Sequence, residues 1–343
     1  MNADARILEK PFDLVAVSLF TRDDREYLDC LPSDGRANRL MHEDDQPGGL
    51  CSFVGQGARN VAPQAKLALC STVGEADQGA VHDALDALRF QRIELFAVAN
   101  KRTNHSRVSM TPSGERQIVR LERERAVNFD EDLNANAYRR LRAVISQSKT
   151  VVLGHLPSDL TAGLIDWARH IGTLAVLCPG KSQFDTLGDL RTHALILNTD
   201  EARTVTGSTS DSTKTVFSEL NRHVQAEQAV IMTTGGGPVF VADRKGGNDW
   251  IVPPRPAPVM AKGQFVLPVG CGDVLAGVVG LALGQPRRLV QNELLYDAIV
   301  LGQAAATAHY YRDSASRETL QAEYQRLLAR MTRDQNAAQK QAA

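Results

Sequence analysis

The sequence has few cysteines and lacks any long apolar run. The cysteines are Cys30, Cys51, Cys70, Cys178 and Cys271. Their odd number, wide scatter and lack of a CxxC pair exclude a disulfide framework and a thiolate zinc site, and are typical of a reducing compartment. No apolar stretch approaches the about 20 residues that a membrane span needs, and the opening residues, MNADARILEKPFD, lack a signal-peptide core. We therefore expect a cytoplasmic protein with no membrane partner.

Excess charge of one sign and a P-loop are also missing. The formal net charge of the 343 residues is −1, which argues against a nucleic-acid partner held by bulk charge. No GxxxxGK[ST] sequence occurs, so a P-loop ATPase is excluded. The segment GQGARNVA, residues 55–62, has only the first two glycines of a dinucleotide fingerprint. Asn60 stands at the third position, which disfavours a dinucleotide-binding fold.

What the sequence does contain is a regular alternation of helical and strand patterns. From about residue 135, amphipathic stretches such as AYRRLRAVISQ alternate with short apolar stretches such as TVVLGH and ALILN. This alternation is typical of βαβ units and predicts a mostly parallel sheet covered by helices on both faces. PVFVAD and DWIVPP are predicted to add antiparallel strands at one end. We expect one α/β domain spanning residues 1–343.

Two segments interrupt this alternation. Residues 24–50 are charged and rich in Asp, Pro and Gly, and residues 97–125 contain strand patterns on either side of the turn signal PSGE. Extra strands from separate insertions often form a lid over the ligand crevice at the carboxyl ends of the main strands. A small β-sheet lid is therefore predicted. The polar tail, residues 332–343, is expected to be disordered.

The stretch LPVGCGDVLAGVVGL, residues 267–281, places small residues and one carboxylate at the start of an apolar helix. The backbone of Gly270, Cys271 and Gly272 could approach an anion closely, because a helix N-terminus presents unpaired N–H groups and a positive dipole end. Asp273 could then accept a proton from a substrate hydroxyl. Alternatively, Asp273 is only an N-cap and the glycines serve the turn. The stretch alone leaves both interpretations open.

Two further elements fall at the ends of predicted strands. In ILNTDEARTVTG, Asn198 ends a strand and Glu201 lies near the start of the next helix, where a carboxylate can hold Mg²⁺ through water and an amide can contact phosphate. The simpler alternative is a helix cap. In VIMTTGGGPVFVAD, residues 230–243, the glycines either cradle a nucleotide or form a plain hairpin.

Together and in this order, these elements resemble the PfkB, or ribokinase-like, family of carbohydrate kinases. LPVGCGDVLAG resembles the family's DTxGAGDxFxxG signature, Asn198–Glu201 its N-x-x-E motif and Thr233–Gly235 its T-x-G strand. GQGARNVA resembles its GGxxxNxA sugar-binding element, and VGEADQG, residues 73–79, its vGxDxxG element. The resemblance spans about residues 12–312. It implies a ribokinase-like three-layer αβα fold and an ATP-dependent sugar or sugar-phosphate kinase.

The resemblance also implies roles for the residues at the nucleotide end. Asp273 would be the catalytic base, and the backbone of Gly270, Cys271 and Gly272 would form the anion hole for the γ-phosphoryl group of ATP. Asn198 and Glu201 would serve the phosphates and Mg²⁺. The residues expected to face the nucleotide are Thr233, Gly235 and Gln303, the last on the adenine side.

On the sugar side, the resemblance points to three positions. Gly57 and Asn60 match the family's hydroxyl-binding element, and Asp23 lies five residues after Ser18, as in the family's Gly-x-x-x-x-Asp spacing, with Asp24 as an adjacent alternative. The lid, residues 102–124, and CPGKSQFDTL, residues 178–187, resemble heptose-7-phosphate kinases. Arg107 and Lys181 could therefore meet a phosphate on the sugar; either could equally be a solvated surface charge.

Several positions depart from the family pattern. Leu267-Pro268 replaces the family's Asp-Thr, which puts a monovalent-cation site in doubt, while Gln56, Cys178 and Ser18 stand where the family commonly has a glycine, an acid and a glycine. These departures motivate an alternative, a sugar- or nucleotide-binding regulator with little catalysis. A nucleoside-type kinase is a further alternative. In many family members the lid also forms a dimer interface, so a homodimer is expected.

Overall fold

A nine-stranded sheet forms the centre of the computed structural model, which describes residues 10–33, 38–121, 126–129, 133–256, 265–285, 292–312 and 316–342. The strand order is β13-β12-β11-β10-β9-β8-β1-β4-β5. Pairing is parallel from β11 to β5, whereas β12 and β13 are antiparallel additions at one end, as predicted. The strands are β1 (Phe12–Val17), β4 (Leu67–Gly74), β5 (Arg92–Val98), β8 (Ser148–Gly154), β9 (Leu174–Cys178), β10 (Ala194–Asn198), β11 (Ala229–Thr233), β12 (Val239–Asp243) and β13 (Asn248–Val252).

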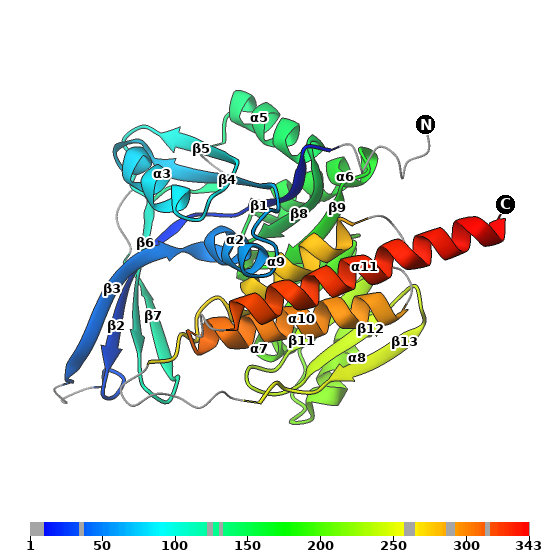
Figure 1. Ribbon diagram of the computed structural model, residues 1–343. Helices are drawn as coiled ribbons and strands as arrows, with labels where there is room; N and C mark the ends of the chain where they lie inside the picture. Colours follow the sequence, from blue (N-terminus) through cyan, green and yellow to red (C-terminus); the bar gives the residue numbers. More distant parts are fainter. Residues whose placement is uncertain are drawn as a thin grey trace.

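Helices cover both faces of this sheet (Figure 1). Alternate residues of β1 enter different cores: Leu14 and Ala16 pack on one face, Val15 and Val17 on the other. This two-residue period is what a strand buried on both faces requires. The first face carries α2 (Gly49–Val61), α3 (Gln78–Asp86), α9 (Cys271–Leu283), α10 (Asn292–Tyr310) and α11 (Arg317–Ala342), and the second α5 (Ala135–Ser146), α6 (Ser158–His170), α7 (Thr199–Thr206) and α8 (Thr213–His223). Two 3₁₀ helices, η1 (Glu75–Asp77) and η2 (Lys181–Asp189), complete the described elements.

A second, four-stranded sheet stands beside the first, in the order β3-β2-β6-β7 (Figure 1). It consists of β2 (Thr21–Leu28), β3 (Leu40–Gly48), β6 (Asn104–Met110) and β7 (Arg116–Arg120). These strands come from the two segments expected to form a lid, with β2 beginning slightly earlier than the first segment. The predicted hairpin around PSGE is the antiparallel pair β6–β7. We call this sheet the lid.

The end of the chain differs from our expectation. We predicted a disordered tail from residue 332, but α11 continues to Ala342. The segment is rich in Ala and Gln and contains no Gly or Pro, so nothing in its composition ends the helix. No helix among the described residues is long and apolar enough to span a membrane.

Helices α2 and α9 approach each other closely through glycine. A Cβ atom on Gly57 would lie 2.3 Å from the carbonyl oxygen of Val274, and one on Gly277 would lie 2.2 Å from that of Val54. Any larger residue would force the two backbones apart. The contact therefore fixes the first turn of α9, which contains Asp273, against α2.

This packing predicts that Gly57→Ala destabilises the protein by about 1–3 kcal/mol, because the added methyl group meets backbone rather than a movable side chain. The matched control is Gly79→Ala in α3, where a Cβ atom would meet nothing within 4 Å. That change should stabilise the helix by about 0.5–1 kcal/mol. Urea unfolding of the two variants measures both effects; equal stability of the two would contradict the packing argument.

Candidate functional site

The candidate site lies at the carboxyl edge of the main sheet. Strands β10 and β11 end in register at Asn198 and Thr233, which are paired neighbours. The first turn of α9 lies at the same edge. This follows from the Cys178 thiol at the end of β9, whose pKa is raised by burial and by the charges of both Asp273 and Glu201. The structure thus brings Asn198, Thr233, Glu201 and the first turn of α9, which lie on separate elements, to the same edge of the sheet.

The N-terminus of α9 is shaped by Gly270. This residue has φ +78°, in the left-handed region, and provides no side-chain cap. A Cβ atom here would lie 2.3 Å from Cγ of Phe53, so glycine is required on steric grounds as well. At Gly272 a Cβ atom would meet nothing within 4 Å. The first-turn N–H groups, which have no partner inside a helix, therefore border open space that an anion can occupy.

Cys271 takes part in this turn through its backbone rather than its thiol. Burial raises the pKa of Cys271 to about 12, and its Sγ lies 3.6 Å from the carbonyl oxygen of Leu267. A neutral thiol is a poor nucleophile at physiological pH. This agrees with the expectation that only its N–H group serves an anion.

Asp273 is half-buried in the first turn of α9. Burial, and next the nearby negative charge of Glu201, raise its pKa to about 7, while the positive charge of Arg116 opposes the rise. A carboxyl group with this pKa exchanges protons near neutral pH, as a general base requires.

Asn198 and Glu201 form a capping box at the start of α7. The Asn198 side chain accepts hydrogen bonds from the N–H groups of Asp200 and Glu201, both at 2.9 Å, and the Asn198 N–H donates to Oε2 of Glu201 at 2.8 Å. The helix-cap interpretation of this motif is thus confirmed. Glu201 also has an electrostatic effect: burial raises its own pKa, and its negative charge raises the pKa of Asp273 further.

The carboxylates of Glu201 and Asp273 fit a magnesium ion held mainly by water and phosphate. Among the described residues, no group of three or more His, Cys, Asp or Glu side chains could bind a metal ion directly. Mg²⁺ commonly keeps several waters and takes only one or two carboxylates plus substrate phosphates. The pair Glu201 and Asp273 provides that number at the edge where phosphates would lie.

The remaining nucleotide-side residues lie as follows. Thr233 ends β11, and its carbonyl oxygen accepts a hydrogen bond from the Thr199 hydroxyl at 3.1 Å. Gly235 has φ +67° in the β11–β12 turn, with nothing within 4 Å of a Cβ atom. Gln303 is buried on α10, and its Oε1 has no hydrogen-bond partner in the described part of the chain. An orphaned amide oxygen of this kind suits a base with an exocyclic amine.

Arg116 is a site residue that the sequence analysis missed. It lies on lid strand β7, and its Nη1 donates to the carbonyl oxygen of Pro268, just before the α9 turn. Its positive charge acts on Asp273, Glu201 and Cys271. The strand RQIVR was assigned to the lid, but nothing in its pattern shows which lid arginine faces α9; that depends on the strand's position.

On the sugar side, Asp23 is only 4% exposed and lies on the inner face of the lid. A Cβ atom on Gly48 would lie 2.1 Å from its Oδ2, so the carboxylate sits directly against the backbone that leads into α2. Burial raises the pKa of Asp23 to about 6, against the lowering effect of Arg25 and His105. A carboxylate in this position can bind sugar hydroxyls once it is ionised.

The glycine that approaches Asp23 is Gly48, the first of the pair Gly48–Gly49, and not a glycine of residues 55–62. Gly49 has φ +79°, and a Cβ atom there would lie 2.7 Å from the carbonyl oxygen of Leu19. The glycines of GQGARNVA, which the sequence analysis matched to the sugar-binding element, lie inside α2. Gly57 packs against α9, and Asn60 lies in the last turn of α2, where it lines a cavity whose lining does not include Asp23.

Of the two cations proposed for a sugar phosphate, Arg107 lies on the opposite face of the lid from Asp23. Successive side chains of β2 alternate between faces, so Asp23 faces inward and Glu26 outward. Arg107 Nε forms an ion pair with Oε1 of Glu26 at 3.2 Å and therefore lies on the outer face of the lid. Lys181 is exposed at the start of η2, beyond the carboxyl end of β9. Asp24, the alternative to Asp23, lies on the other face of β2, because neighbouring side chains of a strand alternate. Its carboxylate contacts His105 at 2.7 Å.

Comparisons with known proteins identify the family and the fold of this chain. Residues 60–318 match the model of a family described as "pfkB family carbohydrate kinase". A ribokinase from Giardia lamblia superposes with a TM-score of 0.72 at 18% identity, covering 92% of this chain and 99% of that one. Phosphofructokinase-2 from Escherichia coli, in complex with fructose-6-phosphate, gives 0.68 at 16% identity, covering 92% and 98%. Arabidopsis thaliana ribokinase, complexed with ribose and ATP, gives 0.63 at 14% identity, covering 91% and 98%. No curated protein sequence is detectably similar to this chain.

The electrostatics of the site predict that Arg116→Gln raises the pKa of Asp273 above its value of about 7, because the nearby positive charge that favours the carboxylate is removed. Asp273 would then stay protonated to higher pH. A ¹³C NMR titration of labelled aspartate carboxyl groups measures this shift. The resonance missing from Asp273→Asn identifies the signal, and an unchanged midpoint in Arg116→Gln would contradict the assigned contact.

Proposed function

Because the chain belongs to the pfkB family of carbohydrate kinases, we propose that it transfers the γ-phosphoryl group of Mg·ATP to a hydroxyl group of a sugar or sugar phosphate. The observation that supports this most directly is the first turn of α9, where open N–H groups adjoin a carboxyl group whose pKa is about 7. Phosphoryl transfer needs little more from a protein than positioning and charge stabilisation.

In this proposal Asp273 accepts the proton of the attacking hydroxyl group, and the N–H groups of residues 270–272 stabilise the charge that develops on the transferred group. Mg²⁺, when bound, neutralises phosphate charge, and Glu201 would hold it through water while Asn198 contacts phosphate. Thr233, Gly235 and Gln303 would border the nucleotide.

The lid supplies the acceptor side of the proposed site. Asp23 binds acceptor hydroxyl groups, with the Gly48 backbone close behind its carboxylate. Arg116 joins the lid to the loop before α9 through its bond to Pro268. A lid held in this way excludes water, so that ATP hydrolysis does not compete with transfer. The outward position of Arg107 favours Asp23 over Arg107 as a direct acceptor contact.

This proposal predicts that Asp273→Asn lowers kcat by about 10²–10⁴-fold with little change in acceptor KM. The control is Asp200→Asn: the Asp200 side chain is 93% exposed, two residues from Asn198. The assay is ADP release over hexoses, pentoses, heptoses, their phosphates and nucleosides, with and without Mg²⁺.

Near-wild-type turnover by Asp273→Asn would contradict the assigned base. Turnover that persists without divalent cation would contradict the role of Glu201. Tight sugar binding with no ADP release from any acceptor would support the alternative of a binding regulator, and turnover of nucleosides alone would support the nucleoside-type kinase.

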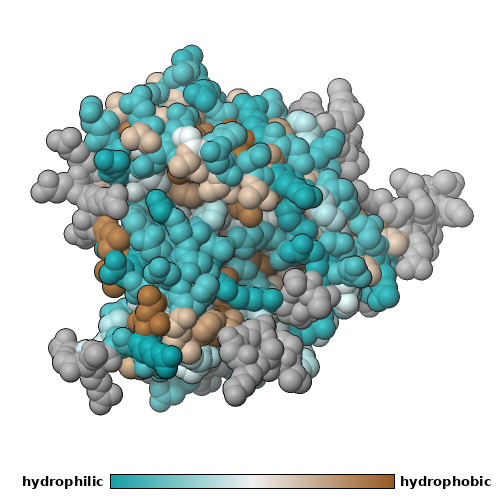
Figure 2. Space-filling model, turned by 60° about the vertical axis from the view of Figure 1, so that its left-hand side comes forward, coloured by the Kyte–Doolittle hydropathy of each residue, from teal (hydrophilic) through white to brown (hydrophobic). Residues whose placement is uncertain are grey.

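We also propose that two copies of the chain associate through the lid. Its edge strands β3 and β7 carry large hydrophobic side chains that are 44–50% exposed: Leu40, Met41, Ile118 and Val119. Hydrophobic residues interrupt an otherwise hydrophilic face in Figure 2. Exposed apolar edge strands favour association with another copy.

For this interface we expect a dimer in sedimentation velocity that Ile118→Lys converts to a monomer. The matched control is Ile251→Lys, since Ile251 is 55% exposed on β13, the edge strand of the main sheet. A monomeric wild-type chain, or equal dissociation by both substitutions, would show that the lid is not the interface.

A further inference from the structure

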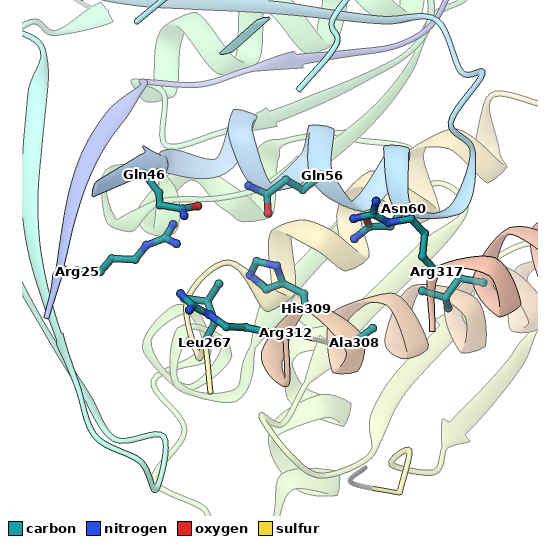
Figure 3. Close-up of a pocket in the computed structure, with 10 residues that line it drawn as sticks. Arg25, Gln46, Gln56, Asn60, Leu267, Ala308, His309, Arg312 and Arg317 are labelled. Carbon is teal, nitrogen blue, oxygen red and sulfur yellow. The ribbon is translucent and has the colours of Figure 1, made fainter. Parts of the chain in front are cut away.

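A cavity lined by strongly basic and polar side chains, which we call the basic cavity, lies between the lid and the helices of the first face (Figure 3). Its volume is about 310 Å³. Arg25 and Gln46 enter it from lid strands β2 and β3, and Gln56 and Asn60 from α2. The third side is formed by His309 near the end of α10, by Arg312 after it, and by Arg317 at the start of α11. Cavities that hold small ligands start at about this volume.

Arg25 is the most unusual residue of this cavity. Its side chain is 1% exposed, and its Nε and Nη2 atoms are buried with no hydrogen-bond partner in the part of the chain that the structure describes. The charges of Asp23 and Asp44 act on Arg25, but neither carboxylate forms an ion pair with it among the described residues. Asp44 is paired instead with Arg312, at 2.9 Å.

Buried guanidinium donors without hydrogen-bond acceptors are costly, since they have lost water and gained no acceptor in its place. An oxyanion in the cavity would satisfy Nε and Nη2 together, because the planar guanidinium group matches two oxygens of a phosphate or carboxylate. The amides of Gln46, Gln56 and Asn60 provide donors and acceptors for the rest of such a molecule.

His309 adds a different kind of partner. Burial lowers its pKa to about 4, so the ring is neutral at physiological pH. Its Nε2 lies 2.8 Å from the carbonyl oxygen of Val269, an acceptor, so Nε2 carries the proton and Nδ1 is left as an acceptor. An acceptor at this point suits a hydroxyl group on the ligand.

The cavity is separate from the proposed phosphoryl-transfer centre. Neither Gly270 nor Asp273 is part of its lining. The buried ring of Phe53 contacts the Gly270 backbone, and the Arg25 guanidinium carbon lies 5.8 Å from the centre of the same ring. The His309 ring meets it edge-on at 5.4 Å. Phe53 therefore links the α9 turn to the cavity without opening one into the other.

We propose that this cavity binds a small hydroxylated molecule that carries a phosphate or carboxylate group, and that Arg25 holds the oxyanion with the support of Arg312 and Arg317. The site is additional to the acceptor site at Asp23 and the nucleotide site at α9. Its occupant contacts the lid, α2 and the α10–α11 connection at once.

The test uses inorganic phosphate as the probe, in isothermal titration of the full chain with a non-hydrolysable Mg·ATP analogue present in excess to occupy the α9 turn. Arg25→Met should weaken phosphate binding at least about tenfold. Gln56→Glu should do the same, because its carboxylate would repel the anion from a position that differs from the wild type by one atom. The matched control is Arg22→Met, an exposed residue of the same strand that pairs with Asp45.

Phosphate should also raise the Tm of the wild type and of Arg22→Met more than that of Gln56→Glu, which keeps the test valid if Arg25→Met does not fold. Absence of phosphate binding by the wild type, or equal affinity in all four proteins, would overturn the proposal. Binding is read without turnover, so this result is independent of whether the chain proves to be a kinase.

Discussion

Glycine allows the backbones of α2 and α9 to pass within contact distance, and the position of the candidate site depends on that contact. Gly57 faces Val274, and Gly277 faces Val54. Because α9 is apolar and almost wholly buried, its packing cannot adjust, and its first turn is held where Gly270 meets Phe53. A rigid, uncapped helix N-terminus at the edge of a parallel sheet is a preformed place for an anion.

The charged side chains around this turn set the pKa values of its carboxyl groups. Burial raises the pKa of both Asp273 and Glu201, the negative charge of Glu201 raises that of Asp273 further, and the positive charge of Arg116 limits the rise in both. Since Arg116 comes from lid strand β7, the positive charge that lowers the pKa of Asp273 belongs to the lid and not to the main sheet.

The fold, and the grouping of Asn198, Glu201 and the α9 turn at one edge of the sheet, were predictable from the sequence, because they depend on local patterns. Strand and helix periodicity indicates the parallel sheet, and short motifs carry Asn198, Glu201 and Gly270–Asp273. The sugar end was less predictable. The motif GQGARNVA suggested Gly57 as a sugar contact, whereas Gly48, at the start of α2, is the glycine that approaches Asp23. Two glycine pairs compete in one segment, and only the start of the helix decides between them.

Arg107, Arg116 and Arg25 show the same limit. All three lie on lid strands, and their roles depend on the face they occupy and on tertiary contacts. Arg107 pairs with Glu26 on the outer face, and Arg116 donates to the carbonyl oxygen of Pro268. Arg25 is buried at the basic cavity. Sequence patterns indicate that a lid exists but not which arginine faces what.

A crystal structure of the chain with Mg·ADP and aluminium fluoride, a mimic of the transferring phosphoryl group, tests the central claim most directly. We expect the fluoride group to lie against the N–H groups of Gly270, Cys271 and Gly272. It should also lie close enough to the carboxyl group of Asp273 for an acceptor hydroxyl between the two to hydrogen-bond to that carboxyl group. Density for the group elsewhere, with the first turn of α9 empty, would contradict the claim.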